Sequence, residues 1–161
     1  MIRLLKAGLF GGVVLAAAGA AAEDAPPHGV WLTEKGKVAV RLHDCDSGLC
    51  GQIVWMAEPH DKTGALRRDT KNPDAAHRDR AWCGLGVISG LKPAPDGSWS
   101  GGRFYYPKHG RSYDLELRPR GDGLEVHAYA GLRMLGVTEA WRRLEGAPGD
   151  CPAGGDRRAG S

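Results

Sequence analysis

The chain has 161 residues, a length that suits one domain, and 22 Lys and Arg against 19 Asp and Glu give a net charge of +3. A charge this small gives no electrostatic case for a nucleic-acid partner. The 25 Gly and 10 Pro residues follow no Gly-X-Y period, so the chain is not a collagen, and a hydrophobic content of 42% argues against disorder. So many turn-forming residues in a short chain favour many short strands.

Residues 1–22 have the features of a secretory signal peptide. Arg3 and Lys6 precede an uncharged apolar run, and Ala20 to Ala22 form a small-residue cleavage site. The alternative is a membrane anchor, but the uncharged run is shorter than the about 20 residues that a spanning helix needs. We therefore predict a cleaved signal peptide, a leader over residues 23–28, no membrane span after cleavage, and a periplasmic or secreted protein.

Four cysteines in an exported chain indicate disulfides. Cys45 and Cys50 flank a turn-rich stretch, so their Cα atoms can approach each other closely enough for a bridge. The remaining pair, Cys83 with Cys151, would tie the Gly/Pro-rich tail, residues 145–161, to the domain and close a long loop. The alternative for this second pair is two free thiols.

Apolar and polar residues alternate in a series of short segments, and this period is typical of strands. Eight strands are predicted within residues 29–144, at 29–32, 37–43, 51–56, 85–91, 99–106, 112–118, 124–130 and 137–143. Short connections make neighbouring strands antiparallel. We predict an all-β fold, an antiparallel eight-stranded up-and-down barrel with one long loop, residues 57–84, after the third strand. A two-sheet sandwich has the same rhythm of strands and is the structural alternative.

Fragments spread along the chain resemble a bacterial domain-of-unknown-function family, number 2147. The fragments that carry the resemblance are Gly29-Val30-Trp31, Cys50-Gly51-Gln52-Ile53-Val54-Trp55, Asp69-Thr70-Lys71-Asn72-Pro73-Asp74, Gly110-Arg111-Ser112-Tyr113 and Trp141-Arg142-Arg143. Their order and spacing hold over residues 29–144. The resemblance implies an exported, lipocalin-like β-barrel and leaves the function open.

Lipocalins in the wider sense open with Gly-x-Trp and place an arginine near the last strand against that tryptophan. The resemblance therefore implies a barrel closure by Gly29, Trp31 and an arginine, Arg142 or Arg143, of which we take Arg142 as the candidate. A guanidinium stacked on an indole contributes about 0.5–2 kcal/mol.

No group of residues predicts a catalytic or metal centre. The six His residues are scattered without ligand spacing. Asp69, Asn72 and Asp74 do not match a calcium-binding loop and favour a turn in which their side chains bond nearby backbone N–H groups. No G-x-S-x-G motif is present. We predict no metal and no cofactor, and catalysis is the least favoured of the function classes.

Residues 57–84 form a loop of the kind that proteins generally retain for binding or covering something. We predict that it folds over one mouth of the barrel. Asp69, Asn72 and Asp74 would pin it to local backbone and, through salt bridges, to Arg78 or Arg80. The alternative is that the arginines of the loop bind an anion.

Aromatic residues within the strands are the candidates for ligand binding. They are Trp55, Phe104, Tyr106, Tyr113 and Trp141, and inside a barrel such residues either line a pocket or fill the core. The first function hypothesis is a barrel that binds a small apolar or amphipathic molecule. The alternative is an envelope interaction or structural protein with a filled barrel, and the oligomeric state stays open.

Overall fold

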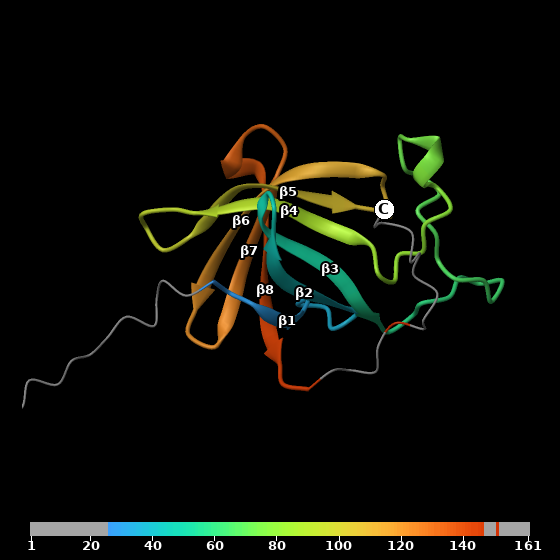
Figure 1. Cartoon of the computed structure of the whole chain (residues 1–161), viewed down its shortest axis with the longest axis horizontal. Helices are drawn as coiled ribbons and strands as arrows, with labels where there is room; N and C mark the ends of the chain where they lie inside the picture. The colour runs from blue at the N-terminus through green and yellow to red at the C-terminus, as the bar shows by residue number, and fades with distance from the viewer. Residues whose placement is uncertain (1–25, 147–150, 152–161) are drawn as a thin grey trace, which may run out of the picture.

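Eight antiparallel strands close into a barrel in their sequence order (Figure 1). The computed structural model describes residues 26–146 and 151. The strands are β1 (Gly29–Leu32), β2 (Val38–Cys45), β3 (Gly48–Met56), β4 (Gly86–Pro93), β5 (Trp99–Tyr106), β6 (Arg111–Arg120), β7 (Gly123–Tyr129) and β8 (Val137–Leu144). Two short 3-10 helices, η1 (Ala75–His77) and η2 (Arg133–Leu135), lie in the connections after β3 and β7.

The closure of the barrel comes from β1, which pairs with both β2 and β8. No sheet edge is left unpaired among the described strands, so the barrel prediction is confirmed and the sandwich alternative is wrong. The predicted signal peptide, residues 1–22, and most of the predicted tail lie outside the described residues.

Both predicted disulfides are present. Cys45 and Cys50 are joined across the hairpin between β2 and β3, with a Cα–Cα distance of 5.9 Å. Cys83, at the end of the long loop, is joined to Cys151, with a Cα–Cα distance of 5.4 Å. The Cys151 amide also donates to the Val54 carbonyl of β3 at 2.9 Å, so this point of the tail is held against the barrel.

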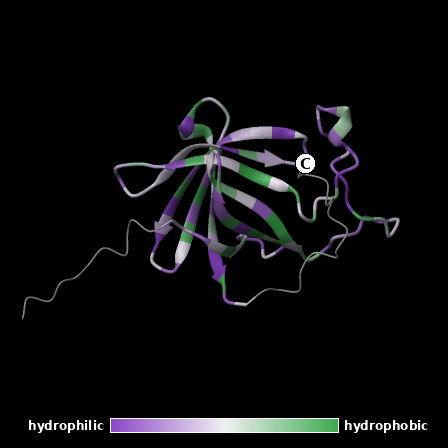
Figure 2. Ribbon diagram, in the orientation of Figure 1, coloured by the Kyte–Doolittle hydropathy of each residue, from purple (hydrophilic) through white to green (hydrophobic). Residues whose placement is uncertain are grey.

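The inner face of the barrel is filled by large apolar side chains, and the alternation of hydrophobic and hydrophilic residues along the strands is visible in Figure 2. The largest fully buried apolar side chains are Leu42, Leu49, Leu91, Leu115, Leu117 and Leu124. Gly102 leaves room for this packing, because a Cβ atom at that position would lie 2.5 Å from the Cγ of Leu91. The interior is therefore a packed core along much of its length.

One end of the barrel, which we call the closed end, is sealed by Trp31. Its indole Nε1 donates to the Pro27 carbonyl at 2.9 Å, and the Arg143 guanidinium lies 4.4 Å from the ring centroid. Arg143 also donates to the His28 carbonyl at 2.8 Å. Arg143 pairs with Trp31 across β8 and β1, so both side chains share one face, whereas Arg142 pairs with Leu32 on the other face. The choice of Arg142 as the closure residue was therefore wrong.

Candidate functional site at the mouth of the barrel

The opposite end of the barrel, which we call the mouth, carries the connections β1–β2, β3–β4, β5–β6 and β7–β8. Three aromatic side chains lie on the inner face near the β5–β6 turn and form what we call the aromatic trio, Phe104, Tyr106 and Tyr113. Phe104 pairs in register with Tyr113 and with Ile88, a core residue, and its ring lies 6.1 Å from that of Tyr106. All three are partly exposed, in contrast to the leucines deeper in the barrel.

The hydroxyl groups of Tyr106 and Tyr113 make no hydrogen bond within residues 26–146 and 151. A tyrosine with a half-exposed ring and an unused hydroxyl offers both an apolar contact and a polar handle. Three of the five predicted ligand-binding residues are thus brought together at the mouth.

The other two predicted ligand-binding residues lie elsewhere. Trp141 is 4% exposed in the packed core and donates from Nε1 to a carboxylate oxygen of Glu139 at 3.0 Å. Trp55 belongs to a separate cluster with Leu32 and Ala39 on the outer side of the sheet. A β-bulge at Val54 is the reason, since one extra residue in a strand turns every following side chain to the other face. The prediction that Trp55 lines the barrel was therefore wrong.

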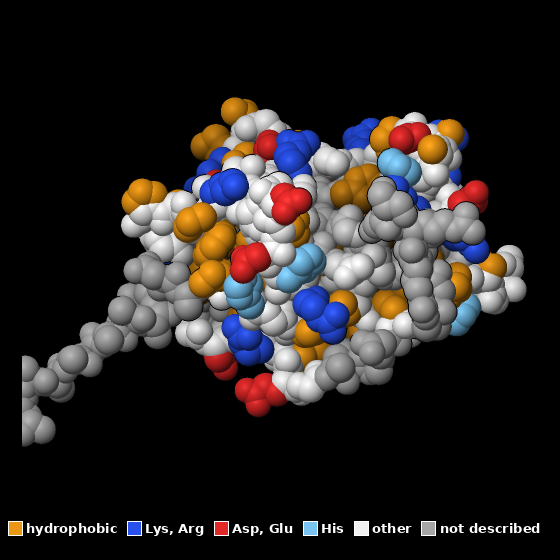
Figure 3. All heavy atoms as spheres, viewed as in Figure 1, with side chains coloured by type: hydrophobic (Ala, Val, Ile, Leu, Met, Phe, Trp, Pro, Cys, Tyr) orange, Lys and Arg blue, Asp and Glu red, His pale blue; other side chains and the backbone are white. Residues whose placement is uncertain are grey.

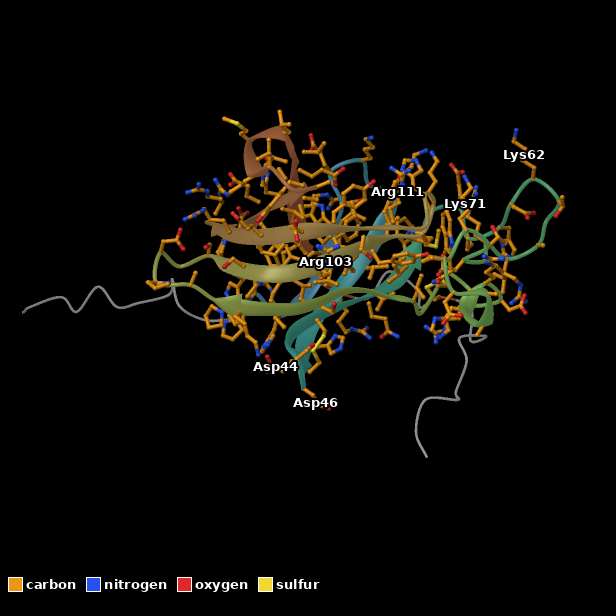
Figure 4. The ribbon with its side chains drawn as sticks, turned by 90° about the horizontal axis from the view of Figure 1, so that it is seen from above. Asp44, Asp46, Lys62, Lys71, Arg103 and Arg111 are labelled. Carbon is orange, nitrogen blue, oxygen red and sulfur yellow. A yellow bond between two sulfur atoms is a disulfide. The ribbon has the colours of Figure 1, made fainter. Side chains whose placement is uncertain are left out.

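Positive side chains stand at the rim of the mouth. Arg111 pairs in register with Tyr106, so its side chain begins on the same inner face as the aromatic trio. The backbone of Lys71 lies against the β5–β6 turn, because a Cβ atom at Gly110 would clash with the Lys71 carbonyl oxygen. Figure 4 shows Arg111 and Lys71 at the end that carries the long loop, with Asp44 and Asp46 away from them. Neither Arg111 nor Lys71 has an acidic partner within salt-bridge distance in the described part of the chain.

The long loop lies beyond the mouth end of the strands (Figure 1) and is joined to the barrel through Asp69. Asp69 is 0% exposed, accepts from the Tyr105 hydroxyl at 2.6 Å and from the Asn72 amide at 2.7 Å, and its own amide donates to the Arg80 carbonyl. Burial and the hydrogen bond to Asp69 raise the pKa of Tyr105 above its usual range. At the end of the loop, Cys83 and Leu85 pack into the core cluster.

The arginines of the loop contact backbone carbonyls. Arg78 donates to the Asn72 carbonyl at 2.8 Å, and Arg68 donates to the Asp79 carbonyl. The side chains of Asn72 and Asp74 accept from amides two residues further along, at 2.9 Å each. Such short side chains bond most readily to neighbouring backbone. The expected salt bridges from these acids to Arg78 or Arg80 do not form in the described loop, so that part of the prediction was wrong.

Two hollows lie on the outer wall of the barrel. One, of about 380 Å³, is lined by polar residues of β6, β7 and β8 together with Arg133 and Met134 of η2. The other, of about 420 Å³, lies over β3, β4 and β5 beside the disulfide between Cys45 and Cys50. Neither contains a member of the aromatic trio.

Within the described residues, no three His, Cys, Asp or Glu side chains are grouped as a metal site would require. None of the helices in residues 26–146 is long and apolar enough to cross a membrane.

Three residues that shape this end of the molecule were not among the candidates from the sequence. Alternation places Tyr105 on the opposite face from Phe104 and Tyr106, but its partner Asp69 lies 36 positions away and no spacing indicates it. Glu139 faces inward opposite Val126. Its position two residues before Trp141 in the same strand could have indicated this, because residues two apart in a strand share a face. Arg111 lies between two of the predicted strands and was assigned to neither, although its position opposite Tyr106 follows from the length of the hairpin.

Comparison with known proteins shows which family the chain belongs to. The model of a family described as "Uncharacterized protein conserved in bacteria (DUF2147)" matches residues 29–143. Among solved structures, protein HP1028 from Helicobacter pylori, described as belonging to the lipocalin family, is similar with a TM-score of 0.63 and 22% sequence identity. The match covers 73% of this chain and 82% of that chain, and at this identity it shows a shared fold. Among curated proteins no sequence matches. The chain belongs to the DUF2147 family of bacterial proteins, and its barrel is lipocalin-like.

Proposed function

We propose that this chain is an extracytoplasmic protein that binds a small amphipathic molecule at the mouth of its barrel. The apolar body of the ligand would lie against the aromatic trio, and its acidic group would lie at Arg111. The two disulfides and the signal-peptide features of residues 1–22 support an oxidising, extracytoplasmic compartment.

The observation that carries the proposal is the contrast between the trio and the rest of the inner face. Deeper in the barrel the side chains are fully buried against one another, so they have no free surface for a ligand. Phe104, Tyr106 and Tyr113 keep exposed ring surface, and two of them keep unused hydroxyls. Binding sites for small molecules are mostly apolar with a few polar groups that fix orientation, and the trio has this composition.

Arg111 supports an acidic group on the ligand. It begins on the same face as Tyr106, and no described acidic side chain neutralises it. A guanidinium in this state binds a carboxylate or phosphate through two parallel hydrogen bonds. Lys71, held against Gly110, adds a second positive charge near the rim.

The experiment compares decanoate with decanol, which share an alkyl chain and differ in charge, by displacement of the apolar fluorophore N-phenyl-1-naphthylamine. We expect Tyr113→Ala to weaken binding of both by about tenfold, because it removes aromatic contact. Arg111→Gln should weaken decanoate by about tenfold and leave decanol unchanged. The matched controls are Tyr129→Ala and Arg142→Gln, since both residues lie on the outer face. Unchanged affinities in Tyr113→Ala would contradict the proposed site.

A second candidate function is a filled barrel that acts through contacts with another envelope protein. The dense packing around Trp31, Trp99 and Trp141 favours it. Native mass spectrometry of protein purified from its host distinguishes the two: a bound molecule of defined mass supports the binding barrel, and ligand-free protein supports the filled barrel.

A further inference from the structure

The connection between β7 and β8, together with the first residue of β8, carries the large hydrophobic side chains that are most exposed among the described residues. They are Leu132 at 62%, Met134 at 85%, Leu135 at 74% and Val137 at 67% exposed. Figure 3 shows hydrophobic side chains at the surface over this connection, which projects from the barrel in Figure 1. Monomeric proteins rarely leave so many apolar groups together in water, and such groups usually mark an interaction site. We call residues 132–137 the apolar lip.

The lip is held in one conformation by its only charged residue. Arg133 donates to both carboxylate oxygens of Glu116 at 2.8 Å, and its carbonyl lies 2.8 Å from a ring nitrogen of His127. The hydrogen bonds from Arg133 hold the pKa of Glu116 below its usual range, so the pair stays ionised and neutralises itself. Arg133 is directed toward Glu116 on the outer wall of the barrel, and its neighbours Leu132 and Met134 are exposed to solvent.

Part of the backbone of the lip is already hydrogen-bonded to neighbouring backbone. The amides of Leu132, Leu135 and Gly136 donate to the carbonyls of Ala130, Leu132 and Arg133, at 3.0, 3.0 and 3.1 Å. A backbone group that is already hydrogen-bonded loses little free energy when it leaves water. Such pairing favours entry into a lipid environment. A partner protein would not require this pairing, because it can supply hydrogen bonds of its own.

The lip is also continuous with the inside of the barrel. Val137 pairs with Ala128, which pairs with the buried core residue Leu115, so all three lie on the inner face. Val137 therefore connects the lip to the inner face of the barrel. Residues 130–138 contain no acidic side chain that would be repelled by anionic headgroups.

From these observations we propose that the apolar lip is a docking surface for a lipid bilayer, and that Met134, Leu135 and Leu132 enter its interfacial region. Docking in this way brings the mouth of the barrel to the membrane surface. The proposal goes beyond the proposed function and stands without it, since it concerns the outer tip of the β7–β8 connection and not the aromatic trio.

The test is co-sedimentation of the mature protein with vesicles of phosphatidylcholine and phosphatidylglycerol, at low salt and at high salt. We expect binding that persists at high salt, because it rests on apolar burial and not on net charge. The double variant Met134→Ser with Leu135→Ser should bind at least about tenfold more weakly, since it removes two exposed apolar side chains. Both positions are exposed, so the fold is expected to be retained, and thermal unfolding checks this.

The matched control is Ala75→Ser with Ala76→Ser, which makes the same kind of change in η1, the other 3-10 helix. It should bind vesicles as the wild type does. Failure of the wild type to bind, or equal binding by the lip variant, would overturn the proposal. A wild type that stays off vesicles but dimerises in sedimentation velocity, with dimerisation lost in the lip variant, would also overturn it and assign the lip to a second copy of the chain.

Discussion

The two ends of this barrel are built in opposite ways. At the closed end, Trp31 has a hydrogen-bond partner for its indole N–H and a guanidinium stacked on its ring. At the mouth, the indole N–H of Trp82 is buried with no hydrogen-bond partner in the described residues, and the Arg67 guanidinium lies further from the ring, at 5.7 Å. The closed end therefore has its polar groups satisfied, whereas the mouth keeps unused hydrogen-bonding capacity.

The same contrast holds for apolar surface. The closed end buries its large side chains, while the mouth exposes the aromatic trio and the apolar lip. A sealed end stabilises the barrel, and exposed apolar groups weaken it unless something binds them. The difference indicates that the closed end is stabilised by packing and satisfied hydrogen bonds, whereas the mouth is held by a long-range disulfide and leaves surface free for interaction. Three comparisons of matched variants test this.

The largest effect is expected from the disulfides, one at each end. Cys83 and Cys151 are 68 positions apart and Cys45 and Cys50 are 5 apart, so the first closes a far longer loop in the unfolded chain. Replacing the long-range pair by alanines should lower the free energy of unfolding by about 4 kcal/mol, and replacing the short-range pair by about 2 kcal/mol. Urea unfolding measures both. Equal losses in the free energy of unfolding would mean that the long-range disulfide between Cys83 and Cys151 stabilises the protein no more than the short-range one.

A smaller effect is expected from one substitution made at both ends. Trp31→Phe removes the hydrogen bond to Pro27 and part of the stacking on Arg143, and should cost about 1–2 kcal/mol. Trp82→Phe removes an N–H that has no partner, so the free energy of unfolding should change by less than about 0.5 kcal/mol. A clear destabilisation by Trp82→Phe would mean that the indole N–H of Trp82 has a hydrogen-bond partner, as that of Trp31 does.

The smallest effects are in the pH dependence of stability, and they have opposite signs at the two ends. Burial and Asp69 raise the pKa of Tyr105, so its contribution is present below the unfolded pKa of about 10 and is lost as the pH rises above it. At the closed end, hydrogen bonds from Ser98 and then Arg118 lower the pKa of Asp96, so its contribution is present above about pH 4 and is lost as the pH falls.

Tyr105→Phe should therefore flatten the alkaline limb of stability, and Asp96→Asn should flatten the acid limb. Thermal unfolding between pH 2 and pH 11 in each variant measures the two limbs against the wild type. If Tyr105→Phe changed the acid limb, or Asp96→Asn the alkaline limb, groups other than these two would control the pH dependence of stability.

How far the sequence determined this molecule is clear from particular elements. The turn residues on either side of it predicted β5 with its observed bounds, and the short connections between successive strands predicted the closed antiparallel eight-stranded barrel. The positions of the four cysteines predicted both bridges, since a hairpin brings Cys45 to Cys50 and leaves Cys83 for Cys151. The strands depend on residues that are neighbours in the sequence. The second disulfide follows because only two cysteines are left once Cys45 and Cys50 are paired.

The tertiary structure alone decided the rest. The bulge at Val54 turns Trp55 outward, and the register between β1 and β8 places Arg143, not Arg142, on Trp31. The hydrogen bond between Tyr105 and Asp69 joins residues 36 positions apart. Bulges, register and long-range partners depend on how distant strands settle against each other in the packed core. A local sequence pattern does not determine that choice, because a register shift of one residue moves every side chain of a strand to the opposite face.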